Sequence, residues 1–255
     1  MQPISVVIIA KNEEHIIAET IQSVLLLTDD VVVCDTGSTD NTIKVAQNAG
    51  AKIINENWQG YGITKNNANQ KAKYNWILQL DADEIVDEQL LQSFFNLDLN
   101  NPKILYRVKF QNYIGNKGIK YGEWGTNKRV RLFNKDFVKW TNDAVHESLI
   151  YDSSFTFTTL KGKVHHKTMI NLKEFETKME VYGKLRGEKY FEIGKKGAFL
   201  KRYFSPIASF IINYFFKLGF LDGKAGFDIA RLNMRYTYIK YHTLYILNCR
   251  NKKSI

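Results

Sequence analysis

Acidic and amide side chains directly follow three short apolar runs in the first hundred residues. Carboxylate and amide oxygens at such positions can accept hydrogen bonds from a nucleoside or hold a hard divalent cation. If the runs are parallel strands, their carboxyl ends meet at one edge of a sheet, where the ligands of open α/β sheets bind. The polar residues are Asn12 and Glu13 after the first run, Asp35 after the second, and Asp81 and Asp83 after the third.

Asp81 and Asp83 are separated by one alanine after the apolar run Trp76–Leu80. Two carboxylates spaced in this way can point toward one ligand if the strand breaks between them. Such oxygen ligands suit Mg²⁺ or Mn²⁺, which in turn bind a diphosphate. Acidic residues also begin helices, where they complement the helix dipole, so the spacing alone leaves this second interpretation open.

Asp35 and Lys65 are two further charged candidates. Asp35 ends an apolar run and can accept from a base N–H or a ribose hydroxyl, while Gly37 permits close approach of the backbone. The alternative is a capping turn that only starts the next helix. Lys65 begins a predicted helix and can reach a phosphate as a point charge, or it can be a solvated surface lysine.

The elements that must position these residues alternate between strand and helix. Four apolar runs are typical of strands covered on both faces: Ile4–Ile9, Val31–Val33, Ala51–Ile54 and Trp76–Leu80. Helical spacing over residues 13–27, from Ile43 to Gly50, and over 65–72 connects them. This alternation predicts an α/β fold with a mostly parallel central sheet.

Beyond residue 101 the pattern changes. Leu105–Phe110 and Arg129–Phe133 alternate apolar and charged residues, as half-solvated strands do. From Leu172 the chain is predicted to be helical and basic, with breaks at Gly194–Gly197 and Gly219–Gly226.

Several protein classes are disfavoured by the sequence. No GxGxxG follows the first strand and no GxxxxGK[ST] occurs, so redox chemistry with dinucleotides and P-loop phosphoryl transfer lose their support. Cys34 and Cys249 are too few for a disulfide scaffold or a zinc ribbon. The first residues lack the basic region of a secretory signal. The longest apolar stretch near the end, Tyr203–Phe216, is too short for a membrane span.

Charge is unevenly divided along the chain, which carries +10 in total. Residues 1–100 contain 6 Lys and Arg against 14 Asp and Glu, whereas residues 101–255 contain 30 against 12. The acidic part suits a metal or a small ligand, and the basic part suits a polyanion. That polyanion could be nucleic acid or an anionic membrane surface, which charge alone does not distinguish.

Segments along nearly the whole chain resemble one known family. ISVVIIAKNEE, VVVCDTGSTDNT, TKNNANQKA and WILQLDADE resemble the inverting family 2 glycosyltransferases, which have the GT-A nucleotide-sugar-binding fold. EWGTNKRVRLF, NDAVHE and FLDGKAGF resemble the lipopolysaccharide core β-1,4-glucosyltransferases that act on inner-core heptose. The resemblance implies a metal-dependent enzyme, using Mg²⁺ or Mn²⁺, that moves a hexose from a UDP-sugar to that acceptor.

The resemblance also implies roles at the sheet edge. Asp35 would contact the uracil, and Asp83 would hold the metal. The other implied donor-site residues are Asn12 and Glu13 beside the nucleoside, Asp81 near the ribose or diphosphate, and Lys65 near the diphosphate.

The general base is implied to lie in NDAVHES. An inverting transfer needs one carboxylate to take the proton of the acceptor hydroxyl. Asp143 and Glu147, which flank His146, are the candidates. Glu147 is favoured, because an aliphatic wall and His146 could tune it. In the other interpretations His146 satisfies a loop carbonyl and Asp143 caps a turn.

Arg129 and Arg131 alternate with apolar residues, so both are predicted to face one side of a strand. One of them would contact an acceptor phosphate or a Kdo carboxylate, and a solvated strand face is the alternative. His165 and His166 have no partner at metal-ligand spacing, which disfavours a zinc site.

Two regions follow from these observations. Residues 1–170 are predicted to form the GT-A domain, with a nucleotide-binding half (1–100) and an acceptor half (101–170), and residues 171–255 a helical, membrane-associating region. Leu200–Leu247 interleaves apolar residues with cations, as interfacial segments do, although these helices could also pack on the sheet. The expected place is cytoplasmic, on the inner face of the cytoplasmic membrane, with a lipid A-core glycolipid as acceptor.

Other functions have less support. A nucleic-acid-binding protein would stack bases on basic aromatic surfaces, but the acidic crevice lies on the half with the clearest fold, so no nucleic-acid partner is expected. A nucleotidyltransferase or a catalytically silent binder of the same fold lacks the Arg- and Gly-rich start that triphosphates call for. Another glycolipid or a polysaccharide is the alternative acceptor within the family.

Overall fold

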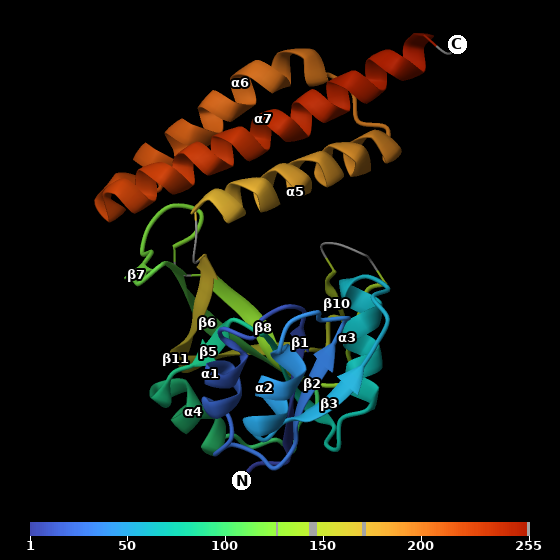
Figure 1. The fold of residues 1–255 in the computed structure, drawn as a ribbon, viewed down its shortest axis with the longest axis vertical. Helices are drawn as coiled ribbons and strands as arrows, with labels where there is room; N and C mark the ends of the chain where they lie inside the picture. Colours follow the sequence, from blue (N-terminus) through green and yellow to red (C-terminus); the bar gives the residue numbers. More distant parts are fainter. Residues whose placement is uncertain (126, 143–146, 170–171, 254–255) are drawn as a thin grey trace. The chain divides into compact units, whose positions relative to one another are not determined.

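The chain forms two compact units in the computed structural model, which is coloured along the sequence in Figure 1. The structure describes residues 1–125, 127–142, 147–169 and 172–253. Unit 1 comprises residues 1–111 and 127–167, and unit 2 comprises residues 112–126 and 168–255. Most of the β-structure belongs to unit 1, and the long C-terminal helices belong to unit 2.

Four parallel strands form the first part of the sheet in unit 1. In spatial order they are β3 (Lys52–Asn55), β2 (Val31–Asp35), β1 (Ile4–Ala10) and β4 (Trp76–Asp81). All residues of β1 are buried, and alternate side chains pack on opposite faces. Val6 and Ile8 belong to one apolar cluster, whereas Val7 and Ile9 belong to another. The strands expected from the apolar runs are therefore confirmed.

Three helices connect these strands, and two of them differ from the predicted bounds. They are α1 (Ile17–Gln22), α2 (Thr42–Asn48) and α3 (Tyr61–Gln70). The helix predicted over residues 13–27 was too long. Beyond α1 the chain forms turns, and there the Ser23 hydroxyl donates to the Thr20 carbonyl at 2.7 Å, which competes with helical pairing. α3 begins before Lys65, directly after Gly60, whose φ of 93° favours glycine.

The sheet continues beyond β4 with antiparallel strands. The order from β4 is β8 (Asn127–Asn134), β6 (Ile104–Ile114), β11 (Thr156–Met169) and β5 (Glu84–Val86), with β7 (Lys117–Gly118) on β6 and a separate pair of β9 (Lys139–Trp140) and β10 (Leu149–Ile150). β6 and β8 confirm the two alternating strands predicted after residue 101. The predicted α/β class, with a parallel central region and a helical C-terminal region, is confirmed.

The chain turns sharply after β4, because β5 pairs with β11 rather than with β4. The next helix is α4 (Glu88–Phe95). It is capped by Asp87, whose carboxylate accepts the Leu90 N–H at 2.7 Å. Asp81 and Asp83 therefore take no part in starting that helix, and the capping interpretation of the Asp-Ala-Asp segment is wrong.

The described residues of unit 2 form three long helices and two short ones. They are α5 (Leu172–Glu192), α6 (Ala198–Ile211), η1 (Ile212–Phe216), η2 (Gly219–Asp222) and α7 (Lys224–Lys253). The breaks between the long helices lie at the two glycine-containing segments expected from the sequence, Gly194–Gly197 and Gly219–Gly226. In the part of the chain that the structure describes, none of the helices combines the length and apolar character needed to cross a bilayer.

The FLDGKAGF segment holds the η2 turn together with the loop that follows β7. The Asp222 carboxylate accepts the backbone N–H groups of Lys120 at 3.0 Å and Tyr121 at 2.8 Å. Gly226 packs so closely on η2 that an added Cβ would lie 1.8 Å from the Gly219 carbonyl oxygen. These residues therefore build unit 2, which accounts for the segment without a role in chemistry.

Candidate active site

Asp35 ends β2 at the carboxyl edge of the parallel strands, as the sequence predicts. Its carboxylate is buried and accepts the backbone N–H groups of Gly37 and Ser38, each at 2.9 Å, together with the Ser38 hydroxyl. These contacts close the turn after β2 and cap no helix, because α2 begins at Thr42 and has Asn41 as its N-cap residue. A carboxylate has about four acceptor sites, so three donors leave capacity for one more hydrogen bond from a ligand.

The loop after β1 lies beside that turn. Asn12 has a φ of 57°, a left-handed conformation that asparagine tolerates, and its side-chain oxygen accepts the Thr39 N–H at 2.8 Å. The next N–H along the loop, from Glu13, donates to the Thr42 hydroxyl at 2.8 Å. The structure therefore brings together the residues predicted to surround the nucleoside.

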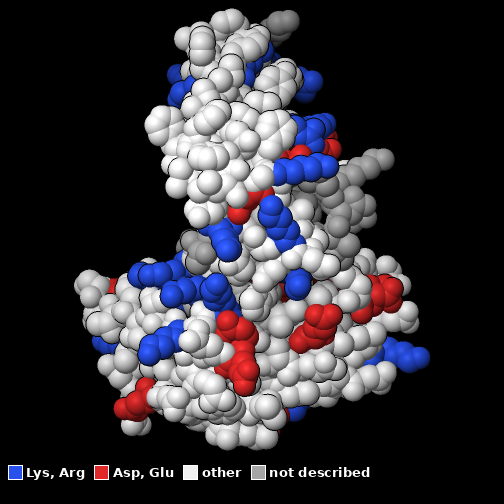
Figure 2. All heavy atoms as spheres, turned by 90° about the vertical axis from the view of Figure 1, so that its left-hand side faces the viewer, with Lys and Arg blue, Asp and Glu red and all other residues white. Residues whose placement is uncertain are grey.

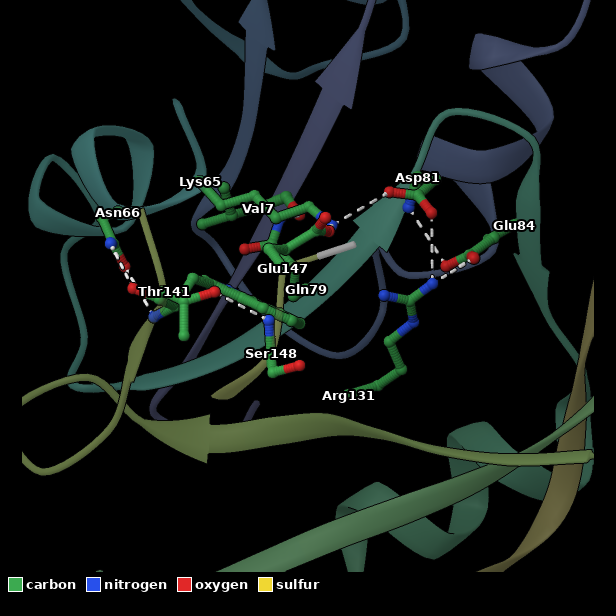
Figure 3. Close-up of polar contacts among 11 residues, drawn as sticks. Val7, Lys65, Asn66, Gln79, Asp81, Glu84, Arg131, Thr141, Glu147 and Ser148 are labelled. Atoms are coloured by element: carbon green, nitrogen blue, oxygen red, sulfur yellow. Dashed lines mark hydrogen bonds and ion pairs between the residues drawn. The ribbon is translucent and has the colours of Figure 1, made fainter. Parts of the chain in front are cut away.

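Lys65 lies in α3 between two carboxylates, as Figure 3 shows. Its Nζ is 2.6 Å from Glu147 Oε1 and 3.9 Å from Asp81 Oδ1, and it lies 4.6 Å from the ring centroid of Trp140. The side chain is buried. Lys65 is consequently not a solvated surface lysine, and it links α3 to the end of β4 and to the segment before β10.

Arg131 occupies a different environment from the one predicted. Its guanidinium is buried, binds Glu84 and lies 3.2 Å from Asp81 Oδ2 (Figure 3). Burial opposes the charged form of Asp81, but Lys65 and Arg131 more than offset it and hold the pKa of this carboxyl well below its usual range. Burial raises the pKa of Glu84 to about 7, although Arg131 acts in the opposite direction. Arg131 therefore neutralises carboxylates of the chain itself, so the expected contact with an acceptor is corrected.

Arg131→Met is expected to lower the free energy of unfolding of unit 1 by about 3–5 kcal/mol, because two carboxylates would lose their buried partner. Urea unfolding followed by circular dichroism measures this loss. The matched control is Arg129→Met on the same strand, where the side chain is exposed and a change below about 0.5 kcal/mol is expected. Equal losses in both variants would contradict a structural role for the buried pair.

Asp83 lies next to His166, a residue that received no role in the site from the sequence. Its Oδ2 lies 3.3 Å from His166 Nε2, because β11 pairs with β5 and places His166 opposite Glu84. Burial opposes protonation of this imidazole, but the hydrogen bond to Asp83 and the neighbouring carboxylates raise the pKa of His166 above its usual value. His165 lies near another residue instead, with Nε2 at 4.0 Å from Asp87 Oδ2.

Asp83 and His166 supply two metal-binding groups side by side. Among the described residues no group of three or more His, Cys, Asp or Glu side chains is suited to one ion. Mg²⁺ in nucleotide enzymes usually keeps one or two protein carboxylates and completes its shell with phosphate oxygens and water. The residues present therefore fit a divalent cation that is bound together with a diphosphate.

Of the three residues considered for base catalysis, Glu147 is the one that the structure describes. Asp143 and His146 lie outside the described residues. Glu147 is mostly buried and directly paired with Lys65. A carboxylate thus lies next to the residues at the end of β4, as a base acting on a ligand there requires.

Arg129 has an exposed side chain on β8, with its guanidinium 4.8 Å from the ring centroid of Phe110. Three contributors to the site received no role in it from the sequence: Glu84, Trp140 and His166. Glu84 follows the Asp-Ala-Asp segment directly, and that adjacency was the one local signal. His166 is brought to the site by the pairing of β11 with β5, and Trp140 by hydrogen bonds between its backbone and the Asn66 side chain on α3. The sequence carries no local pattern for either contact.

Comparison with known proteins gives three kinds of match. The profile of glycosyl transferase family 2 matches residues 5–156, more than half of the chain. An uncharacterized glycosyltransferase of Rickettsia typhi is 30% identical over 89% of this chain and 81% of its own length. The lipopolysaccharide core biosynthesis glycosyltransferase LpsC of Rhizobium meliloti is 26% identical over 95% of this chain and 92% of its own length.

A solved structure is also similar over part of the chain. It is glucosyl-3-phosphoglycerate synthase from Mycobacterium tuberculosis in complex with Mg²⁺ and uridine diphosphate. The two proteins are 24% identical, with a TM-score of 0.36, over 44% of this chain and 43% of that chain. The alignment thus spans less than half of either protein.

Proposed function

The chain belongs to glycosyl transferase family 2, and from this membership we infer that it moves a hexose, expected to be glucose, from a UDP-sugar to an inner-core heptose of lipopolysaccharide or lipooligosaccharide. The similarity to LpsC, a lipopolysaccharide core biosynthesis glycosyltransferase, supports this acceptor class. The observation that carries the proposal is Lys65, held between Glu147 and Asp81 beside the turn that bears Asp83.

The donor nucleoside would bind along the loop at Asn12 and Glu13 and the turn at Asp35. Hydrogen bonds between these two segments hold them side by side, and the remaining acceptor capacity of Asp35 suits an N–H of uracil. Lys65 would place its positive charge near the diphosphate. Asp81 would lie near the ribose or the diphosphate and orient the Lys65 side chain. A donor held by these residues, with its diphosphate at Lys65, would have its anomeric carbon near Glu147.

Asp83 and His166 would hold Mg²⁺ or Mn²⁺ next to the diphosphate. When bound, the ion neutralises charge that develops on the departing UDP. Arg131 would position the metal-binding turn, because it binds Asp81 and Glu84, which flank Asp83 in the sequence. A rigid turn would thereby present the Asp83 carboxylate to the ion.

Glu147 would act as the general base. It takes the proton of the acceptor hydroxyl as that oxygen forms a bond to the anomeric carbon, and the bond from this carbon to the diphosphate oxygen breaks. UDP leaves with the electron pair from the face opposite the attacking oxygen, so the configuration inverts. Lys65 holds the carboxylate of Glu147 in position before the acceptor arrives.

The acceptor side would include Arg129, whose exposed guanidinium suits an acceptor phosphate or a Kdo carboxylate. Residues 1–170 would carry out the transfer, and residues 171–255 would contact an anionic membrane surface. A lipid-borne acceptor supports a protein that works at the inner face of the cytoplasmic membrane as a peripheral enzyme.

The test is UDP release by the purified full-length protein from UDP-glucose and from UDP-galactose. Each donor is supplied with Mg²⁺ or Mn²⁺ or with EDTA, and with or without heptose-bearing core lipid. Release that needs both the lipid and the metal, from UDP-glucose in preference to UDP-galactose, is the expected result. Release stimulated by another glycolipid would correct the acceptor, and pyrophosphate release from a nucleoside triphosphate would overturn sugar transfer.

A further inference from the structure

A strip of exposed apolar side chains runs along α6 and continues into η1 in unit 2. On α6 it comprises Leu200, Tyr203, Phe204, Ile207 and Ile211, whose spacing by three or four residues places them on one face. Phe204 is 67% exposed, and Phe216 in η1 is 78% exposed. Water-facing surfaces of monomeric proteins rarely carry so much continuous apolar area without a partner.

The charges along this strip have one sign. Residues 198–222 contain the cations Lys201, Arg202 and Lys217 and a single acid, Asp222. Asp222 is buried and accepts backbone N–H groups within unit 2, so it contributes no negative charge to the surface. Figure 2 shows a face of unit 2 on which uncharged side chains predominate, with Lys and Arg and a few Asp and Glu at its edges. An apolar strip with a cationic margin is complementary to an anionic bilayer.

A groove of about 360 Å³ opens between α6 and α7 beside the strip. Its lining includes Tyr203 from the strip and three arginines, Arg202, Arg231 and Arg235, and the described residues that line it include no acid. Two of these arginines are neutralised from α5: Arg231 lies 2.6 Å from a Glu176 oxygen, and Arg235 binds Glu180. The groove therefore offers the charge of the third arginine to a ligand.

Arg202 is held by aromatic rings rather than by a carboxylate. Its guanidinium carbon lies 3.9 Å from the ring centroid of Tyr245, 4.6 Å from that of Tyr203 and 5.0 Å from that of Phe199. Within the described part of the chain its buried Nε has no hydrogen-bond partner and its guanidinium forms no ion pair. A guanidinium that is positioned by rings and lacks an internal anion is suited to bind a phosphate.

We propose that the α6 strip enters an anionic phospholipid bilayer and that the groove at Arg202 binds the phosphate of one lipid head group. The apolar side chains reach the acyl chains, and Lys201 and Lys217 lie at the level of the head groups. The proposal deepens the proposed function by assigning the membrane contact to particular residues. Lipid binding requires neither donor nor metal, so its failure and a failure of UDP release are separate results.

The experiment is sedimentation of the full-length protein with vesicles of phosphatidylcholine alone or mixed with phosphatidylglycerol. The wild-type protein is expected to bind the mixed vesicles more tightly. Arg202→Gln should weaken that binding about fivefold, the factor for one interfacial cation. It should weaken binding to phosphatidylcholine less, because choline balances the charge of that lipid's phosphate. Phe204→Ser combined with Phe216→Ser should weaken binding to both kinds of vesicle.

Matched controls lie in unit 1. Arg107→Gln removes another ring-stacked guanidinium, 3.8 Å from the Phe157 centroid, and Phe137→Ser removes another half-exposed phenylalanine. Both should bind vesicles as the wild type does, and thermal unfolding identifies any variant that is not folded. Wild-type binding by folded Arg202→Gln would overturn the head-group site. The head-group site would also be overturned if inorganic phosphate saturated the groove while the protein bound no vesicles. The groove would then be a site for free phosphate.

Discussion

Asp83→Ala is expected to abolish sugar transfer and to leave the protein folded. Asp83 is partly exposed beside His166 and, unlike Asp81, is not paired with Lys or Arg within the described residues. Without this ligand the charge on the departing UDP would be poorly neutralised. A loss of roughly 4 kcal/mol of transition-state stabilisation corresponds to a decrease of about a thousandfold in kcat/KM. Steady-state UDP release at saturating Mn²⁺ measures the loss.

The role of Asp83 can be separated from folding by measuring the metal directly. Mn²⁺ binding in the presence of UDP, followed by electron paramagnetic resonance, should weaken in Asp83→Ala and also in His166→Gln. Asp29→Ala is a suitable control, because Asp29 is exposed on unit 1 and pairs with Lys73 at 2.6 Å, away from the end of β4. Full activity of Asp83→Ala, with unchanged Mn²⁺ binding, would remove the metal role from this residue.

Glu147→Gln is expected to lower kcat by about 10²–10⁴-fold with little change in the KM for the donor. Glutamine keeps the shape of the side chain, and its amide oxygen can still accept from Lys65, so the end of α3 should stay in place. The amide cannot take the proton of the acceptor hydroxyl, so the loss falls on the chemical step. Initial rates at varied UDP-glucose and fixed core lipid separate kcat from KM.

Asp143→Asn is the comparison that decides which carboxylate is the base. The fall in kcat should occur in Glu147→Gln and not in Asp143→Asn, and circular dichroism should show that both variants are folded. A large fall in kcat for Asp143→Asn, with nearly normal turnover by Glu147→Gln, would instead assign the base to Asp143. Glu147 would then remain a partner that orients Lys65.

Much of the fold was predictable because it depends on local pattern. Strand β1 is apolar at every position and buried at every position, as a central parallel strand must be. The helix breaks in unit 2 follow from glycines in the chain. The bounds of α1 and α3 were wrong by several residues, because side-chain hydrogen bonds and the positive φ of Gly60 determine where these helices begin or end.

The sequence by itself determined the strands, the polar groups at their ends, the family resemblance and the one-sided charge of the chain. Only the tertiary structure decided which groups meet. Lys65 and Glu147 are 82 residues apart, and Arg131 and Asp81 are 50 apart. Their contacts depend on the order and register of strands, which long-range packing fixes and local periodicity does not encode. For the same reason Arg131 is buried against Asp81 and Glu84, and His166 lies beside Asp83.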